Sequence, residues 1–216
     1  MVDDDTVSLS NLQRQVLHTT ARIGWSKTAS TAATIAALNP DVRLVQHPMR
    51  LKADNALPLF SQYDLVADGS DNFATRFLVN DACYLTGRTL VSAALLGFEG
   101  QLATFKAHLP GPNPCYRCLF PAPPPPDLAP SCAEAGVLGV LGGTMGSLQA
   151  TEVIKEILEL GDSLSGRLLI YDALGPNFRT VRVRRDPACR LCGEHPSIRD
   201  LAGTGTGAGT GTSTGA

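Results

Sequence analysis

The apolar and polar positions in the first part of the chain alternate between a helical and an extended pattern. Across residues 26–38, small apolar side chains recur at the three- and four-residue spacing of one helical face, and Asn39-Pro40 ends the segment. Residues 41–47 then have the pattern of a strand, and a shorter helix interrupted by Pro58 is predicted over residues 53–62. Such alternation is typical of a parallel sheet whose strands are joined by helices.

Two short apolar runs predict buried strands of this sheet, at residues 63–67 and 89–96, with a helix between them at residues 73–86. The first run leads into Asp68-Gly69-Ser70-Asp71-Asn72, where Asp68 is expected to end the strand. Open α/β sheets bind ligands outside the carboxyl ends of their strands. The polar residues of this loop are therefore candidates for a ligand site.

The second part of the chain predicts antiparallel pairing. Residues 99–106 are expected to pair with a neighbouring strand, and residues 167–171 and 178–183 to form an antiparallel pair. An amphipathic helix is predicted over residues 144–160, with Gly161 as its C-cap. Its predicted buried stripe consists of Ala150, Val153, Ile154, Ile157 and Leu158. The predicted fold class is α/β, a Rossmann-like and mostly parallel sheet with an antiparallel C-terminal portion.

Composition indicates a globular protein, because 44% of the 216 residues are hydrophobic and only 18% are charged. A net charge of −2 argues against nucleic acid or an anionic membrane as the main partner. No run approaches the roughly 18 apolar residues of a membrane span, and a cytoplasmic location is expected. Residues 203–216 contain only Gly, Thr, Ala and Ser, which predicts a disordered tail after one domain at residues 1–202.

Two Cys-x-x-Cys pairs, Cys115 with Cys118 and Cys189 with Cys192, carry the clearest chemistry in the sequence. A two-residue gap lets one tight turn present two thiolates to one ion, and four thiolates satisfy tetrahedral Zn²⁺. The long separation between the pairs is tolerable because loop-closure entropy grows only slowly with length. A structural four-cysteine zinc knuckle is predicted, with disulfides or unrelated reduced thiols as the alternatives.

Five short runs, in this order and spacing, resemble the ThiF/MoeB/HesA family of ubiquitin-activating-like enzymes. The resemblance extends from about Val2 to Gly193. The runs are Ser8-Leu9-Ser10-Asn11-Leu12-Gln13-Arg14-Gln15, Gly24-Trp25-Ser26-Lys27, Asp68-Gly69-Ser70-Asp71-Asn72, Cys115-Tyr116-Arg117-Cys118 and Gly146-Ser147-Leu148-Gln149-Ala150.

The resemblance implies a homodimeric adenylyltransferase that uses ATP and Mg²⁺. Its expected substrate is the C-terminal glycine of a small ubiquitin-like sulfur-carrier protein, which is adenylated with release of pyrophosphate. A separate sulfur donor then completes the thiocarboxylate, for thiamine or molybdopterin-type sulfur transfer. This function is the leading prediction for the chain.

The resemblance also implies roles for residues near the start of the chain. Asp3 matches the acid that holds the ATP ribose, and Asn11 and Gln15 match polar nucleotide contacts. Arg14 and Lys27 match the basic pair on the triphosphate, as a planar clamp and a point charge respectively. Taken alone, both cations can equally be solvated surface charges.

Three further residues receive candidate roles from the same resemblance. Asp71 matches the carboxylate on the Mg²⁺ side, with Asn72 beside it at the nucleotide; a hard carboxylate oxygen suits Mg²⁺. Taken alone, Asp71 can equally cap the following helix. Cys132 matches a cysteine that forms a persulfide or acyl-disulfide in some members, and its alternative is a role without chemistry.

The phosphate-binding glycine loop of the family has no counterpart in this chain. Neither G-x-G-x-x-G nor G-x-x-x-x-G-K-[ST] occurs, and the glycines of residues 136–146 are better explained by close packing before a helix. We therefore expect impaired ATP binding and unpaired edges on the neighbouring strands. The alternative functions are a catalytically impaired remnant that keeps the dimer or carrier surface, and a zinc-bearing dinucleotide-binding dehydrogenase.

Overall fold

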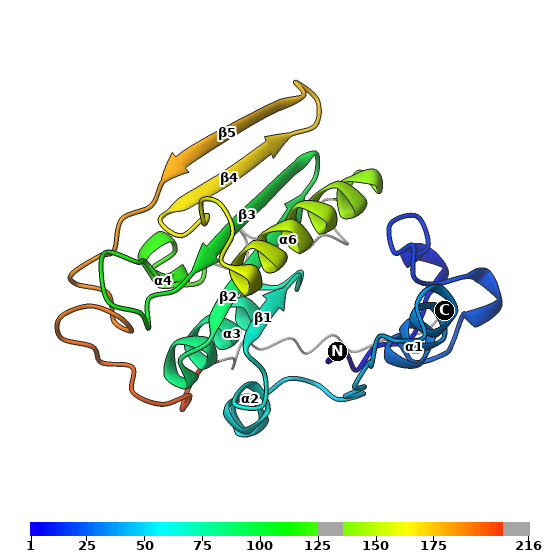
Figure 1. The fold of residues 1–216 in the computed structure, drawn as a ribbon, viewed down its shortest axis with the longest axis horizontal. Coiled ribbons are helices and arrows are strands. Elements are labelled where there is room, and N and C mark those ends of the chain that lie inside the picture. The colour runs from blue at the N-terminus through cyan, green and yellow to red at the C-terminus, as the bar shows by residue number, and fades with distance from the viewer. Residues whose placement is uncertain (125–135, 205–216) are drawn as a thin grey trace.

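The computed structural model describes residues 1–124 and 136–204, and the remainder of the predicted tail lies outside them. Its body is one five-stranded sheet in which the spatial order of the strands follows the chain (Figure 1). The strands are β1 (Leu65–Asp68), β2 (Thr89–Leu96), β3 (Glu99–Phe105), β4 (Arg167–Asp172) and β5 (Asn177–Arg182).

The pairing of neighbouring strands changes once across this sheet, from parallel to antiparallel. β1 and β2 are parallel, with Leu65 opposite Thr89, whereas β2 through β5 are antiparallel. The α/β class and the antiparallel C-terminal portion are confirmed, and that portion takes three of the four strand pairings. Among the described residues β1 pairs only with β2, so it forms the expected open edge of the sheet.

Two helices cover opposite faces of the sheet, α3 (Phe73–Thr86) and α6 (Val140–Leu158). Because side chains alternate along a strand, Leu90 joins the core with Phe77 of α3, whereas Val91 joins the core with Met145 of α6. The predicted bounds of α3 and β2 agree with the structure. Asn72 caps α3 by accepting a hydrogen bond from the Thr75 N–H at 2.8 Å.

The face that α6 presents to the sheet differs from the predicted stripe. The helix buries Leu141, Met145 and Glu152. Met145 lies so close to Gly100 of β3 that a Cβ at that glycine would meet its sulfur at 2.5 Å. Because the helix turns Met145 toward the sheet, other apolar side chains point away from it. Ile154, Ile157 and Leu158 are 54%, 62% and 58% exposed. Ala150 is exposed as well, so of the predicted stripe only Val153 packs against the core.

The ends of α6 also differ from the prediction. The helix begins at Val140, four residues before the predicted start. Its C-cap is Glu159, in the left-handed conformation with φ of 53°, and not Gly161. Gly161 has a positive φ of its own two residues later, so the turn out of the helix is longer than a single glycine cap.

The N-terminal segment lies to one side of the sheet in Figure 1 and contains α1 (Lys27–Leu38). Ser26 caps α1 by accepting from the Ala29 N–H at 3.2 Å. The chain then reaches α2 (Ala53–Phe60), with Pro58 inside it, and α2 packs on α3. Short 3₁₀ helices lie at Leu9–Asn11 and Thr20–Arg22.

The strand predicted at residues 41–47 was wrong. Only His47 forms a bridge, parallel to Val2, and the other residues are bends or coil. A strand needs a partner along its whole length, and the N-terminal segment bonds to this stretch only near its end, at Val45 and His47. A four-residue helix that the pattern did not predict, α4 (Tyr116–Leu119), begins directly after Cys115 and contains Cys118. None of the described helices has the length and apolarity that crossing a membrane requires.

Candidate functional site

The four paired cysteines meet in one cluster, as the sequence predicts. Their sulfur atoms lie within 4.8 Å of one another, at 3.9 Å for Cys115–Cys118, 3.6 Å for Cys115–Cys189 and 3.4 Å for Cys118–Cys192. Four sulfurs about 2.3 Å from one tetrahedral ion are about 3.8 Å apart, whereas a disulfide joins sulfurs about 2.0 Å apart. All four are free thiols, so the cluster fits a metal ion.

The thiols share protons unequally within this cluster. Hydrogen bonds from Cys115, Cys118 and Cys192 lower the pKa of Cys189, whereas hydrogen bonds with the other three cysteines raise the pKa of Cys115. The hydrogen bond with Cys115 is the main cause that lowers the pKa of Cys118 to about 7. A cation that binds all four sulfurs as thiolates must therefore displace protons.

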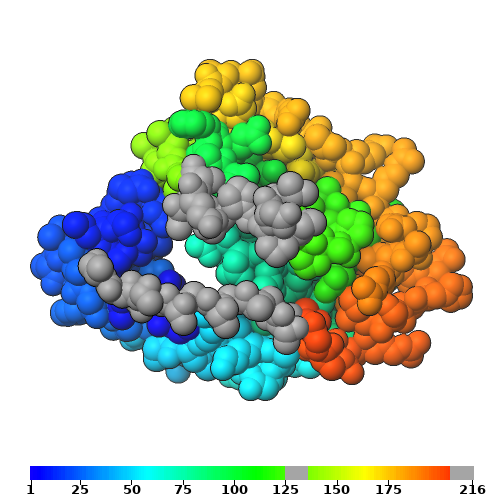
Figure 2. Space-filling model, turned by 180° about the vertical axis from the view of Figure 1, so that it is seen from behind, coloured from blue at the N-terminus to red at the C-terminus, as the bar shows by residue number. Residues whose placement is uncertain are grey.

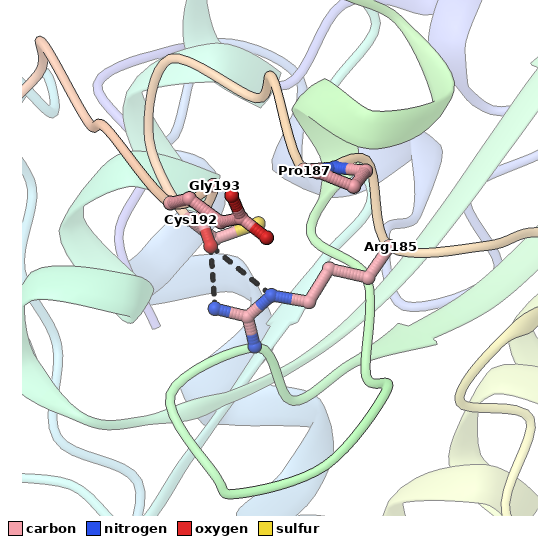
Figure 3. Close-up of a pocket in the computed structure, with 5 residues that line it drawn as sticks. Arg185, Pro187, Cys192 and Gly193 are labelled. Atoms are coloured by element: carbon pink, nitrogen blue, oxygen red, sulfur yellow. Dashed lines mark hydrogen bonds between the residues drawn. The ribbon is translucent and has the colours of Figure 1, made fainter.

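Arg185 fixes the turn of the second cysteine pair, as Figure 3 shows. Its guanidinium donates through Nε to the Cys192 carbonyl at 3.0 Å, and through Nη1 to the Ala107 carbonyl at 3.2 Å. A surface depression of about 300 Å³ lies here, lined also by Pro187, Gly193 and Glu194. Because backbone carbonyls already occupy the guanidinium, Arg185 ties the knuckle to the end of β3.

A second polar group near the start of the chain brings together two of the predicted nucleotide residues. The ammonium of Lys27 lies 2.7 Å from an Asp5 carboxylate oxygen and 3.9 Å from one of Asp3. The Lys27 side chain is 11% exposed, whereas that of Asp5 is 66% exposed. The sequence reasoning missed Asp5, although residues two apart in an extended segment face the same side.

Asn11 ends the first 3₁₀ helix, and Arg14 and Gln15 lie just after it. Arg14 donates to the Ser10 carbonyl at 3.2 Å, the Gln15 N–H donates to the Asn11 carbonyl at 3.0 Å, and the buried Gln15 Oε1 has no hydrogen-bond partner. This segment packs on the start of α6. A Cβ at Gly142 would lie 3.2 Å from the Arg14 carbonyl oxygen, so the expected close packing is found there and at Gly139, whereas a Cβ at Gly136, Gly143 or Gly146 would meet nothing within 4 Å.

The loop after β1 holds the remaining predicted residues. Asp68 is buried; one oxygen accepts from the Ser70 N–H at 2.9 Å, the other has no partner, and burial raises the pKa of this carboxyl. The side-chain oxygen of Asn72 accepts the hydrogen bond that caps α3, and Asp71 is exposed. Within residues 1–124 and 136–204, no hydrogen bond or ion pair links Asp71 to the predicted cations.

Two side chains that the sequence reasoning missed brace this loop. Arg76 donates twice to the Ser70 carbonyl, at 3.0 and 2.9 Å. Gln149 of α6 donates to the carbonyls of Asp68 and Val91, at 2.8 and 2.9 Å. It thereby fixes α6 to the last residue of β1 and to β2. Cys132 lies outside the described residues.

Seen from behind, the N-terminal segment and the sheet border an open gap (Figure 2). The segment with Asp3, Arg14 and Lys27 is coloured blue there, and the sheet lies on the other side in cyan and green. The N-terminal segment supplies cations and acids, and the sheet supplies a loop that carries carboxylates. Phosphate and divalent-metal chemistry uses groups of these kinds.

Comparison with known proteins gives a consistent result. The ThiF family model matches residues 1–191. A sulfur carrier protein adenylyltransferase of Thermus thermophilus is 51% identical over 205 residues, covering 93% of this chain and 75% of that protein. The bovine adenylyltransferase and sulfurtransferase MOCS3 is 52% identical over 202 residues, covering 93% of this chain and 44% of that protein. The chain thus spans less than half the length of the bovine relative.

The fold is also found among solved structures. A crystal structure of E. coli MccB with MccA-N7isoASN superposes with a TM-score of 0.74 at 18% identity, covering 89% of this chain and 58% of that one. At this identity the likeness concerns the fold alone.

Proposed function

The chain belongs to the ThiF family, and from this premise we propose that it adenylates the C-terminal glycine of a ubiquitin-like sulfur-carrier protein. In this reaction a carboxylate oxygen of the glycine attacks the α-phosphorus of ATP. The bond from the α-phosphorus to the bridging oxygen breaks, and pyrophosphate leaves with the electron pair. Sulfide-level sulfur from a separate donor then replaces AMP at the glycine carbonyl and leaves a thiocarboxylate, in thiamine or molybdopterin-type sulfur transfer.

The observation that carries this proposal is the similarity to relatives named as adenylyltransferases, at about half identity over 93% of the chain. The similarity includes the segment with Asp3, Arg14 and Lys27 and the loop with Asp71, since the family match runs through both. No observation on the described residues favours a nonenzymatic role.

The chemistry assigns separate tasks to the named residues. Negative charge shifts onto the pyrophosphate as it leaves, and cations held in place before the reaction stabilise that charge. Lys27 is suited to this because the carboxylates of Asp5 and Asp3 hold its ammonium in place. Arg14 makes one exposed hydrogen bond and remains available for a phosphate. Asn11 and Gln15 supply amides beside it.

Asp71 and Asn72 would face the polyphosphate from the sheet. Asp71 would hold Mg²⁺, which would supply positive charge to the phosphate oxygens. The loop is braced for such a task by Arg76 and Gln149.

The cysteine cluster is proposed to hold Zn²⁺ in a structural role. The sulfur–sulfur distances of 3.4, 3.6 and 3.9 Å fit the ion, and four protein ligands leave no coordination position for a reacting group. The site would then join two segments of the chain. The loop after β3 carries Cys115 and Cys118, and the segment after β5 carries Cys189 and Cys192.

The proposed function is tested by ATP–pyrophosphate exchange with a purified sulfur carrier that ends in glycine. Exchange is expected with the intact carrier, and not with the same carrier lacking its last glycine, because that carboxylate is the nucleophile. Isothermal calorimetry with ATP reports nucleotide binding separately. Carrier binding without any exchange would contradict the enzymatic proposal and support the impaired remnant.

We also propose a homodimer, with the exposed apolar face of α6 at its interface. Ile154, Ile157 and Leu158 share this face and stay accessible in the single chain, which is costly for a large apolar patch in water. Ile157→Glu is expected to halve the mass measured by light scattering, because the interface would have to bury a charge. Leu174→Glu is the matched control, since Leu174 is exposed on the turn between β4 and β5. An unchanged mass for Ile157→Glu would place the interface elsewhere.

A further inference from the structure

Two consecutive polar residues of α3, Asn80 and Asp81, are buried inside the protein. Asp81 is fully inaccessible, and Asn80 is 2% exposed. Burying a carboxylate is costly unless it is paired and hydrogen-bonded. The positions of their partners therefore indicate what these residues do.

Both residues direct their hydrogen bonds at the first cysteine pair, 36 positions along the chain. Asn80 Oδ1 accepts from the backbone N–H of Tyr116 at 2.8 Å. Arg117 makes a two-point contact with Asp81, from Nε at 2.7 Å and from Nη2 at 2.6 Å. The Arg117 guanidinium also lies 4.7 Å from the Phe77 ring centroid. The two residues between Cys115 and Cys118 are thus both held by α3.

The same carboxylate reaches the chain beyond the second cysteine pair. Thr204 Oγ1 donates to Asp81 Oδ2 at 3.3 Å, and the nearby Leu201 is buried in the core that contains Phe77. Arg185 independently fixes the Cys192 carbonyl. Asp81 therefore contacts Arg117, which lies within the first cysteine pair, and Thr204, which follows the second pair.

We propose that Asp81, through Arg117, is a positioning residue for the metal centre, an inference that rests on the proposed metal binding. A net stabilising role is a weaker explanation, because a buried ion pair often contributes no more than apolar side chains of similar volume. Its two-point geometry instead fixes an orientation. Arg117 adjoins Cys118, so any rotation of this turn moves the Cys115 and Cys118 sulfurs away from Cys189 and Cys192.

The test is the rate at which zinc-loaded protein transfers its ion to a coloured chelator, measured well below the thermal midpoint. Asp81→Asn and Arg117→Lys are expected to release zinc about tenfold faster, a change at the lower end of that seen for outer-sphere partners of metal ligands. Arg117→Lys keeps the positive charge and loses the two-point contact. Circular dichroism checks that each variant is folded.

Glu152→Gln is the matched control. Glu152 is a buried acid of α6 that pairs with Lys155, on the opposite face of the sheet. The Glu152→Gln substitution is expected to lower the thermal midpoint without changing the zinc release rate. If the role of Asp81 were merely structural, Asp81→Asn would also lower the midpoint and leave the release rate unchanged. If Asp81→Asn does not fold, Arg117→Lys decides the question alone.

Folded Asp81→Asn and Arg117→Lys variants that release zinc at the wild-type rate would overturn the inference. A wild-type protein that binds no zinc would instead overturn the proposed metal binding, and the inference with it. The two failures are distinguished by the zinc content of the wild-type protein.

Discussion

Cys189→Ser is expected to reduce the zinc content from about one ion per chain to nearly none and to destabilise the fold strongly. The site would lose one of its four sulfur ligands, since Cys189 is a buried member of the cluster. Binding energy at a structural zinc site is also folding energy. A loss of about 4 kcal/mol would lower the thermal midpoint of a chain of this size by roughly 8–16 °C.

The matched control is Cys83→Ser, which makes the same chemical change at another buried cysteine. Cys83 lies in α3 outside the cluster, and burial raises the pKa of its thiol well above the usual value. The control is expected to cost about 1–3 kcal/mol for a buried hydroxyl and to keep a full complement of zinc. Elemental analysis and thermal unfolding measure both quantities. A Cys189→Ser protein that retains one zinc per chain would disprove the four-thiolate site.

Arg14→Ala is expected to lower the rate of carrier-dependent ATP–pyrophosphate exchange by about 10²–10³-fold. The proposed task of the guanidinium is to neutralise charge on the leaving pyrophosphate, so the loss should appear in kcat as well as in KM. Its one exposed hydrogen bond, to the Ser10 carbonyl, makes a large loss of stability unexpected. Lys27→Ala would be harder to interpret, because it leaves the Asp5 and Asp3 carboxylates unpaired.

Arg43→Ala serves as the control for Arg14→Ala, since Arg43 is an exposed arginine on the segment after α1. It is expected to exchange at the wild-type rate. Asp71→Ala should produce a loss of similar size that added Mg²⁺ partly offsets, because the proposed defect is in holding the ion. Equal rates for Arg14→Ala and Arg43→Ala would remove Arg14 from the reaction.

The sequence alone determined the features that depend on short-range interactions. The bounds of α3 and β2 follow from local periodicity and from a capping asparagine. The two cysteine pairs were recognisable because each turn brings its own sulfurs together within four residues. The resemblance to the ThiF family was recognisable for a similar reason, because the residues that carry it form short continuous runs.

Only the tertiary structure decided which face of α6 meets the sheet, and that Asp81 holds Arg117. The first depends on Met145 fitting against Gly100, and the second on a contact between residues 36 positions apart. An apolar stripe identifies a side of a helix that avoids water, and either the same chain or another copy can cover it. Which of them does so is set by packing between distant segments, and no local pattern encodes that packing.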